Sequence, residues 1–251
     1  MVATLRNLAQ RKENLFGDLD RRDPHLHLLE LDVTREDNIV QARQWFESQN
    51  FGLDCLVNNA GFGLFGAVED LTLGELRAQF EVNFFGLVRT TQEFLPLLRE
   101  RRGRIINASS TLGFTGMPLS ASYTSTKFAV EGWSECLALD LAPHHVKVSL
   151  IEPGAFKTSF SDNLRWAKKS ELASSLYFEQ TQAFKKARQR YRRSPPAEAV
   201  VKKMVWTCET PRLPLRVRVG YDAALAYWAR KILPQQFFFQ LLKWVFSKMK
   251  A

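Results

Sequence analysis

The stretch GRIINASSTLGFTGMPLSASYTSTKFAVEGWSECLALDLAPHHVKVSLIEPG, residues 103–154, reads as a strand, a helix and a second strand. The short apolar runs at 103–109 and 146–154 suit strands that are covered on both faces. A helical pattern separates them, from about Ser120 to Leu141. Two strands joined through a helix predict a crossover unit with parallel strands.

The same alternation continues on both sides of this stretch. Further strands are predicted at 2–5, 25–33, 53–57 and 215–220, and further helices at 34–46, 71–98, 159–193, 195–208 and in the tail. Thr34 with Asp37, and Thr72 with Glu75, have the spacing of helix capping boxes. The pattern predicts an α/β fold with a doubly wound parallel sheet.

No internal repeat or linker divides the chain, so we expect a single domain over 1–251. A length of 251 residues, 45% of them hydrophobic, is enough for one large core. Within this domain, residues 159–193 are predicted to form a lid and residues 221–251 a helical tail.

The charge and the cysteines narrow the class of protein. The net charge is +9, and its densest run, KKARQRYRR at 185–193, is interpreted as a solvated helix face because no nucleic-acid-binding signature accompanies it. Cys55, Cys136 and Cys208 lie far apart in the sequence. They have neither metal-ligand spacing nor the pattern of a disulfide framework, which predicts no metal site and a reducing compartment.

Unusual residues fall where the predicted strands end. They are Arg6, Asp32, the NNAG of 58–61, Ser109 with Ser110, and Pro153 with Gly154. Ligands of doubly wound sheets bind beyond the carboxyl ends of the strands. The sequence therefore predicts a single site at this edge of the sheet.

Three side chains at this edge suggest acid–base chemistry. Tyr123 and Lys127, four residues apart, share one face of a helix. A free phenol has a pKa of about 10, and a neighbouring ammonium lowers it. Tyr123 would then exchange a proton with a substrate oxygen, which Ser110 would hold by a hydrogen bond. A tyrosine–lysine pair at helical spacing is common on protein surfaces, so the interpretation depends on its conjunction with the strand ends.

Six segments together resemble the short-chain dehydrogenase/reductase family, most closely its hydroxysteroid and retinol dehydrogenase-like branch. They are LDVT at 31–34, NNAG at 58–61, EVNFFG at 81–86, GRIINASS at 103–110, YTSTK at 123–127 and IEPGAFKT at 151–158. They follow the family's order and spacing over about residues 1–160, and the remainder resembles it loosely. The resemblance implies a Rossmann-type fold and an oxidoreductase that interconverts hydroxyl and carbonyl groups.

The resemblance also implies roles for individual residues. Tyr123 would be the general acid/base, Lys127 the group that lowers its pKa and holds the nicotinamide ribose, Ser110 the anchor of the substrate oxygen, and Asn83 the holder of a water in a proton relay. The cofactor contacts expected in addition to Tyr123 and Lys127 are Arg6, Asp32, Val33, Asn59, Ala60, Gly61, Pro153, Gly154 and Thr158.

Arg6 bears on the choice of nicotinamide cofactor. It stands after the predicted second strand of the family fold, where a carboxylate binds the ribose of NAD and an arginine accommodates the 2′-phosphate of NADP. This placement favours NADP, with NAD as the alternative. An exposed arginine at the start of a helix, with no role in cofactor binding, would give the same sequence pattern.

The glycine-rich turn of the family, TGxxxGxG, does not occur in this chain. GFGLFG at 61–66 follows a different strand and lacks the threonine. We expect the sheet to lack its first strand, which would leave a gap between the strands at 2–5 and 53–57. Either the sequence is a truncated record of a longer protein, or the chain is a cofactor-free homologue that acts as a binding or interaction protein.

The C-terminal third suggests partners. Apolar side chains in 159–193 predict a lid over a pocket for a small lipophilic substrate, such as a steroid, retinoid or fatty compound, although they could also only pack the lid onto the domain. The tail mixes aromatic residues with lysines, so peripheral membrane contact stays open beside simple packing. We expect a cytoplasmic homodimer paired through long helices, as in relatives.

Overall fold

The structure is a computed structural model that describes residues 1–8, 10, 23–158, 160, 164–189 and 194–247. Its main helices and strands are β1 (Val2–Leu5), β2 (His27–Glu30), α3 (Glu36–Ser48), β3 (Cys55–Asn58), β4 (Leu64–Phe65), α4 (Leu73–Phe80), α5 (Gly86–Arg101), β5 (Arg104–Ala108), α6 (Ala121–Leu141), β6 (Lys147–Pro153), β7 (Arg165–Trp166), α8 (Phe178–Gln189), α9 (Glu198–Glu209), β8 (Arg216–Val219), α10 (Tyr221–Ile232) and α11 (Gln235–Ser247).

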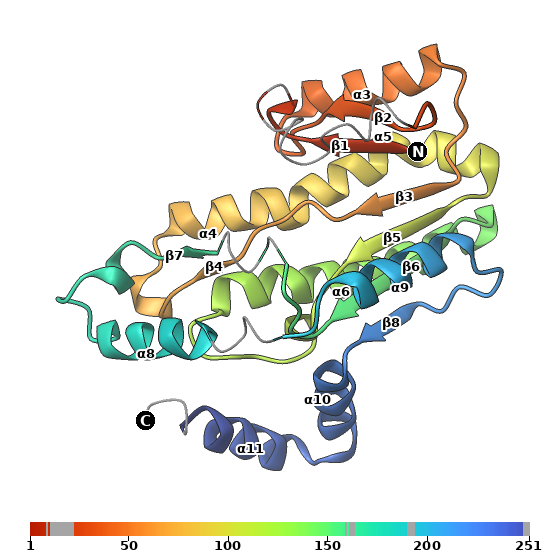
Figure 1. The fold of residues 1–251 in the computed structure, drawn as a ribbon. Coiled ribbons are helices and arrows are strands. Elements are labelled where there is room, and N and C mark those ends of the chain that lie inside the picture. The colour runs from red at the N-terminus through yellow and green to blue at the C-terminus, as the bar shows by residue number, and fades with distance from the viewer. Residues whose placement is uncertain (9, 11–22, 159, 161–163, 190–193, 248–251) are drawn as a thin grey trace.

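The predicted doubly wound parallel sheet is confirmed, and it is divided in two. One sheet has the order β3-β5-β6-β8 and the other pairs β1 with β2, all in parallel. Figure 1 shows β1, β2 and α3 together at one end of the molecule, apart from the larger sheet. No described strand lies between β1 and β3, which is the gap expected from the missing glycine-rich segment.

Neighbouring residues of the central strand β5 face opposite layers. Ile105 belongs to the apolar cluster that contains side chains of α3, α5 and α6. Ile106 belongs to a second cluster, to which Val200 and Met204 of α9 are packed. Alternation along a strand sends successive side chains to opposite faces, so both faces of the sheet are covered.

The helix expected over 71–98 is interrupted by one wide turn. Thr72 forms the predicted capping box with Glu75 at the start of α4. Residues Glu81–Phe85 then form a π-helical turn before α5 continues to Arg101. Such single-turn insertions occur often at functional sites, and Asn83 lies within this one.

The capping box predicted for Thr34 and Asp37 is wrong. The helix α3 begins one residue later, with Arg35 as its N-cap and no side-chain capping bond. The Thr34 hydroxyl instead donates to Asp32 Oδ1 at 2.7 Å. Asp32, at the end of the strand, competes for the hydroxyl that a capping box would need.

The lid is not the long helix predicted over 159–193. Its described part contains strand β7, the 3₁₀ turn Lys169–Glu171 and helix α8. β7 pairs in parallel with β4, a short strand just after the NNAG segment. Residues 190–193, part of the basic run, lie outside the described residues.

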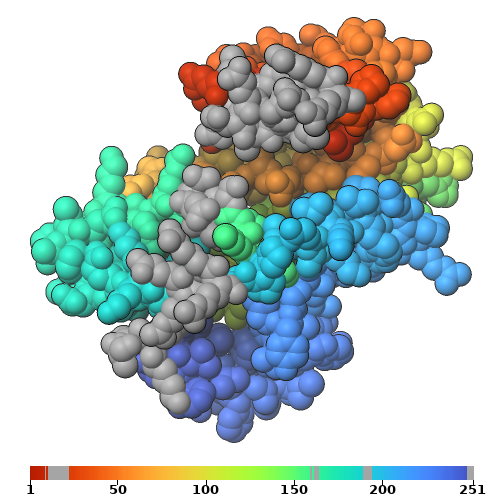
Figure 2. Space-filling model, viewed as in Figure 1, coloured from red at the N-terminus to blue at the C-terminus, as the bar shows by residue number. Residues whose placement is uncertain are grey.

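The tail is helical, as predicted. Helices α10 and α11 follow β8 and lie below the α/β body in Figures 1 and 2, where they are blue. In the part of the chain that the structure describes, no helix combines the length and the apolar character needed to cross a bilayer.

Candidate functional site

Ser110, Tyr123 and Lys127 meet at the end of β5, as the sequence predicts. Ser110 is the second residue after β5 and caps the short turn Thr111–Gly113, accepting a bond from Leu112 N at 3.2 Å. Its hydroxyl is near enough to the phenol of Tyr123 to lower the pKa of that group. Lys127 follows one turn later on α6, with Nζ 5.6 Å from the centre of the Tyr123 ring.

The predicted lowering of the Tyr123 pKa does not occur in this structure. Burial raises the pKa of the Tyr123 phenol, and the nearby Ser110 hydroxyl opposes that shift only in part. The Lys127 ammonium donates to the carbonyl of Ala108 at 2.6 Å. Burial also lowers the pKa of Lys127 to about 8, against the opposing charge of Glu131. At neutral pH the phenol is therefore uncharged, and the Lys127 amine stays mostly protonated although its pKa is lowered.

Aromatic rings enclose the Tyr123 phenol. The Phe65 ring stacks on it at 6.0 Å between centroids, and the Phe160 ring lies at 5.4 Å. Tyr123 is only 6% exposed. Because desolvation disfavours the phenolate, this enclosure is the cause of the raised pKa of Tyr123. Movement of the two rings away from the phenol would lower that pKa again.

Asn83 is buried in the π-helical turn and fixes the segment that follows NNAG. Its Nδ2 donates to the Phe62 carbonyl at 2.9 Å, and its Oδ1 accepts from Phe62 N at 3.0 Å. Nδ2 also lies 3.3 Å from Thr126 Oγ1. A Cβ added to Gly61 would lie 3.1 Å from Asn83 Oδ1. Asn83 thus couples the NNAG loop to α6, and its role in a proton relay stays a prediction.

The other predicted cofactor contacts on the larger sheet lie at the ends of β3 and β6, which flank the central strand β5. Asn59, Ala60 and Gly61 follow β3 and are exposed. Gly154 and Thr158, with Pro153, follow β6 and are partly exposed. Exposed backbone at the carboxyl ends of parallel strands is suited to a flat ligand.

Gly154 is held against the first turn of α10. Asp222 Oδ2 accepts from Ala155 N at 2.6 Å, and a Cβ on Gly154 would come within 2.0 Å of Asp222 Oδ1. A larger residue here would displace the Asp222 carboxylate from this position. Asp222 therefore positions the loop after β6, and no pattern in the sequence pointed to it.

Arg6, Asp32 and Val33 lie on the smaller sheet, away from the residues just described. Arg6 is exposed at the end of β1. Asp32 Oδ1 accepts from both Thr34 N and Thr34 Oγ1, so the carboxylate is at least a strand-end cap. Val33 packs against Gly86 of α5, where a Cβ would lie 2.6 Å from Val33 Cγ2.

Glu131 is a second residue that the sequence analysis missed. It lies one turn after Lys127 on α6, is buried, and accepts a hydrogen bond from the Ser109 hydroxyl. Arg216 Nε donates to Glu131 Oε2 at 3.0 Å. Burial raises the pKa of Glu131, and these partners oppose the shift. The spacing from Lys127 was a usable signal, because residues i and i+4 share a helix face.

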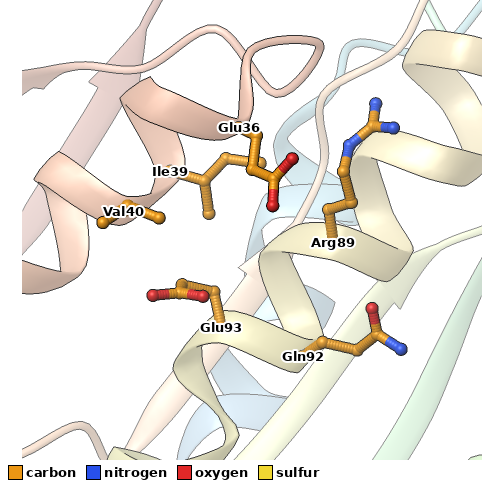
Figure 3. A pocket seen from close by; sticks show the side chains of 6 residues that line it. All are labelled: Glu36, Ile39, Val40, Arg89, Gln92 and Glu93. Carbon is orange, nitrogen blue, oxygen red and sulfur yellow. The ribbon is translucent and has the colours of Figure 1, made fainter.

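A hollow of about 90 Å³ between α3 and α5 lies outside this site. It is lined by Glu36, Ile39, Val40, Arg89, Gln92 and Glu93, and Figure 3 shows them on the two facing helices. None of the predicted site residues lines it. Among the described residues, no cluster of histidine, cysteine and carboxylate side chains could hold a metal ion.

The family model for short chain dehydrogenases matches residues 1–169. The chain belongs to this family. A 3-ketodihydrosphingosine reductase of Bacteroides thetaiotaomicron is 45% identical over 139 residues, which are 55% of this chain and 52% of that protein. Human retinol dehydrogenase 8 is 35% identical over 165 residues, which are 65% of this chain and 52% of that protein. The chain thus matches about half the length of these relatives.

Solved short-chain dehydrogenases share the fold. One from Streptomyces avermitilis is 28% identical, with a TM-score of 0.75, and the match covers 99% of this chain and 84% of that one. Other matched structures of this fold, at 20–25% identity, contain NADP or NADH. The likeness confirms the fold and the oxidoreductase family, and it leaves the choice between the two cofactors open.

Proposed function

We propose that this protein is a nicotinamide-dependent oxidoreductase that interconverts a hydroxyl and a carbonyl group. The observation that carries the proposal is the meeting of Ser110, Tyr123 and Lys127 at one strand end. Exposed residues at Asn59–Gly61 and the partly exposed loop at Gly154 fit a cofactor that lies across the ends of β3 and β6. A bound nicotinamide would supply or accept the hydride.

The chain's own residues would handle the proton. In the reducing direction, the Tyr123 O–H donates its proton to the substrate oxygen as that oxygen gains charge, and Ser110 donates a hydrogen bond to the same oxygen. The phenolate that remains is stabilised by the protonated Lys127 across the ring. Burial keeps Tyr123 protonated before the reaction, so the phenol is ready to act as the acid.

NADP is the proposed cofactor because of Arg6. A guanidinium forms paired hydrogen bonds with a phosphate, which NADP has and NAD lacks. Titrating the chain with NADPH and with NADH while following nucleotide fluorescence tests this choice. Arg6→Ala is expected to weaken NADPH binding and leave NADH binding unchanged. An equal loss of affinity for both nucleotides would contradict a role of Arg6 in the preference for NADP.

The proposed substrate is a lipophilic alcohol or ketone. Aromatic side chains from the lid, among them Phe160 and Trp166, form one cluster with Phe65 and Tyr123. Two relatives are named for 3-ketodihydrosphingosine and for retinol. A series of ketones of increasing chain length should show a rising kcat/KM. A flat or falling series would argue for a small polar substrate.

A cofactor-free binding protein is the second candidate, favoured by the separation of β1 from β3. The pyrophosphate cradle of this family lies at the first strand. If NADPH and NADH both fail to change fluorescence in the titration above, this candidate replaces the enzyme. Saturable binding of either nucleotide excludes it.

A cytoplasmic location with peripheral membrane contact through the tail is also proposed. Phe237, Leu241 and Trp244 form an exposed stripe at helical spacing along α11, and Lys243 stands beside it. No Asp or Glu follows Asp222 in the sequence. A cationic apolar surface suits anionic lipid. Trp244 fluorescence should shift to the blue with vesicles containing phosphatidylserine, and sedimentation with them should weaken in Leu241→Glu.

A homodimer is proposed through the long helices α5 and α6. Phe85, at the end of the π-helical turn, and Phe128 of α6 are large apolar side chains that are 45% and 40% exposed. Light scattering after gel filtration should give twice the chain mass, and Phe128→Glu should reduce it to the monomer. A monomeric wild-type chain would contradict the proposal.

A further inference from the structure

Two cysteines that are remote in the sequence lie together in the fold. Cys55 begins β3 and Cys208 lies in the last turn of α9, 153 residues later. Their sulfur atoms are 3.3 Å apart, with Cys55 as the hydrogen-bond donor. Both thiols are partly exposed. The sequence analysis found no cysteine pair because spacing along the chain cannot show this contact.

Arg104 lies next to both thiols. It is the partner of Cys55 in the β3–β5 register. Its Nη1 donates to the carbonyls of Thr207 and Thr210, at 2.9 Å each, on both sides of Cys208. One guanidinium therefore holds the end of α9 and places positive charge beside the sulfur atoms.

This environment makes Cys208 the more reactive thiol. The bond from Cys55 and the charge of Arg104 lower the pKa of Cys208 to about 7, against burial and the charge of Glu209. The pKa of Cys55 is raised by its bond with Cys208 and by burial. The thiolate is the nucleophile of cysteine chemistry, and cations favour it. Cys208 thus fits the attacking role and Cys55 the resolving role.

We propose that Cys55 and Cys208 are a redox modification site at which low-molecular-weight disulfides of the glutathione type form an intramolecular disulfide. The Cys208 thiolate attacks the reagent, forms a mixed disulfide and releases one reagent thiolate. The Cys55 thiol, losing its proton to solvent, attacks the Cys208 sulfur and releases the second. The two cysteines are oxidised and the reagent is reduced to two thiols.

The bond requires only a small movement. A disulfide has a sulfur–sulfur distance of about 2.0 Å, so the sulfur atoms must approach by about 1.3 Å from their present separation. The bond would join α9 to β3, the strand that leads directly to Asn59–Gly61. It would close a long loop, which restricts the unfolded chain and stabilises the fold.

Thiol counting and mass spectrometry test the site, and neither depends on nucleotide binding or turnover. The reduced chain has three cysteines. After treatment with oxidised glutathione, we expect one free thiol, a mass lower by two hydrogens, a peptide linking Cys55 with Cys208, and a higher Tm that dithiothreitol reverses. Cys136→Ser, the matched control at an exposed cysteine, should form the same link.

Single variants separate the two roles. Cys55→Ser is expected to stop at a glutathione adduct on Cys208, and Cys208→Ser is expected to react several-fold more slowly than the wild type. Cys55→Ala serves the same purpose if the serine variant does not fold. Three free thiols after oxidation of the wild type, or an adduct on Cys136 alone, would overturn the proposal.

Discussion

At the scale of residues, burial of the Lys127 amine lowers the stability of the folded protein. Its amine is buried, and its folded pKa of about 8 is below the ordinary value of 10.5. Between these two pH values, the unfolded chain binds more protons than the folded one. Stability therefore rises with pH across this window, and the penalty is fully present below pH 8.

Lys127→Met should reveal that penalty. We compare the Tm of the variant with the Tm of the wild type at each pH. The variant's Tm should be highest relative to the wild type at pH 7. The difference should move in favour of the wild type by roughly 5–10 °C on going to about pH 10, because the shift corresponds to a few kcal/mol. Differential scanning calorimetry at the two pH values measures it. A pH-independent difference would contradict the buried amine.

Glu131 is expected to act through Lys127. Its negative charge raises the pKa of Lys127, opposing burial. Glu131→Gln should therefore lower the pKa of Lys127 and move the alkaline limb of the pH–rate profile to lower pH by about one unit. A profile that keeps its alkaline limb in place would show that Glu131 only supports the fold.

Glu135→Gln is the matched control. Glu135 accepts from Arg216 Nη2 at 2.6 Å, as Glu131 accepts from Nε, but it is exposed. It is not among the groups that shift the pKa of Lys127. Its variant should leave the profile unchanged.

At this scale the sequence predicted the meeting of Ser110, Tyr123 and Lys127 because helical spacing and strand ends determine it. It could not predict the direction of the Tyr123 pKa. That direction depends on Phe65 and Phe160, which reach the phenol from other segments. Burial by distant side chains has no local signature.

At the scale of elements, Asp70 holds the segment after β7, which belongs to the proposed lid. It is 2% exposed, and its Oδ2 accepts from the hydroxyls of Ser170 at 2.7 Å and Ser175 at 2.6 Å. Ser170 Oγ in turn accepts from Ala67 N at 3.2 Å. This buried network connects the 3₁₀ turn at Val68–Asp70 to the segment after β7. Lid opening must break it.

Asp70→Ala should loosen the lid without changing the sheet. Amide hydrogen exchange over 165–175 is expected to accelerate about 10-fold, which corresponds to about 1.4 kcal/mol for lost bonds to a charged group. Glu69→Ala, at the exposed neighbouring position, should leave exchange unchanged. Equal exchange in both variants would mean that apolar packing alone holds the lid.

The elements that the sequence predicted well are those with strong periodicity or caps, such as α6 and the Thr72–Glu75 start of α4. The lid was predicted as one helix because its polar composition hides β7. That strand exists through pairing with β4, a contact about 100 residues away in the sequence. The π-helical turn at Asn83 was also missed, since helical patterns do not distinguish one extra residue.

At the scale of the whole molecule, two sheets share one apolar layer. Leu31 and Ile39, from the side of the smaller sheet, lie in one cluster with Phe94 and Ile105. Yet no described strand pairs with the edge of β3 that faces the smaller sheet, and Val57 is 40% exposed. The order of the remaining strands followed from the resemblance, and so did the gap.

The comparison of wild type with Tyr123→Phe tests the central claim most directly. Loss of NADPH absorbance is followed with a long-chain ketone at matched, saturating nucleotide. Phenylalanine preserves the ring that packs between Phe65 and Phe160 but removes the proton. We predict turnover by the wild type and a decrease in kcat of about 10²–10⁴-fold in the variant, with the nucleotide saturating in both. Turnover that survives in Tyr123→Phe would contradict the account.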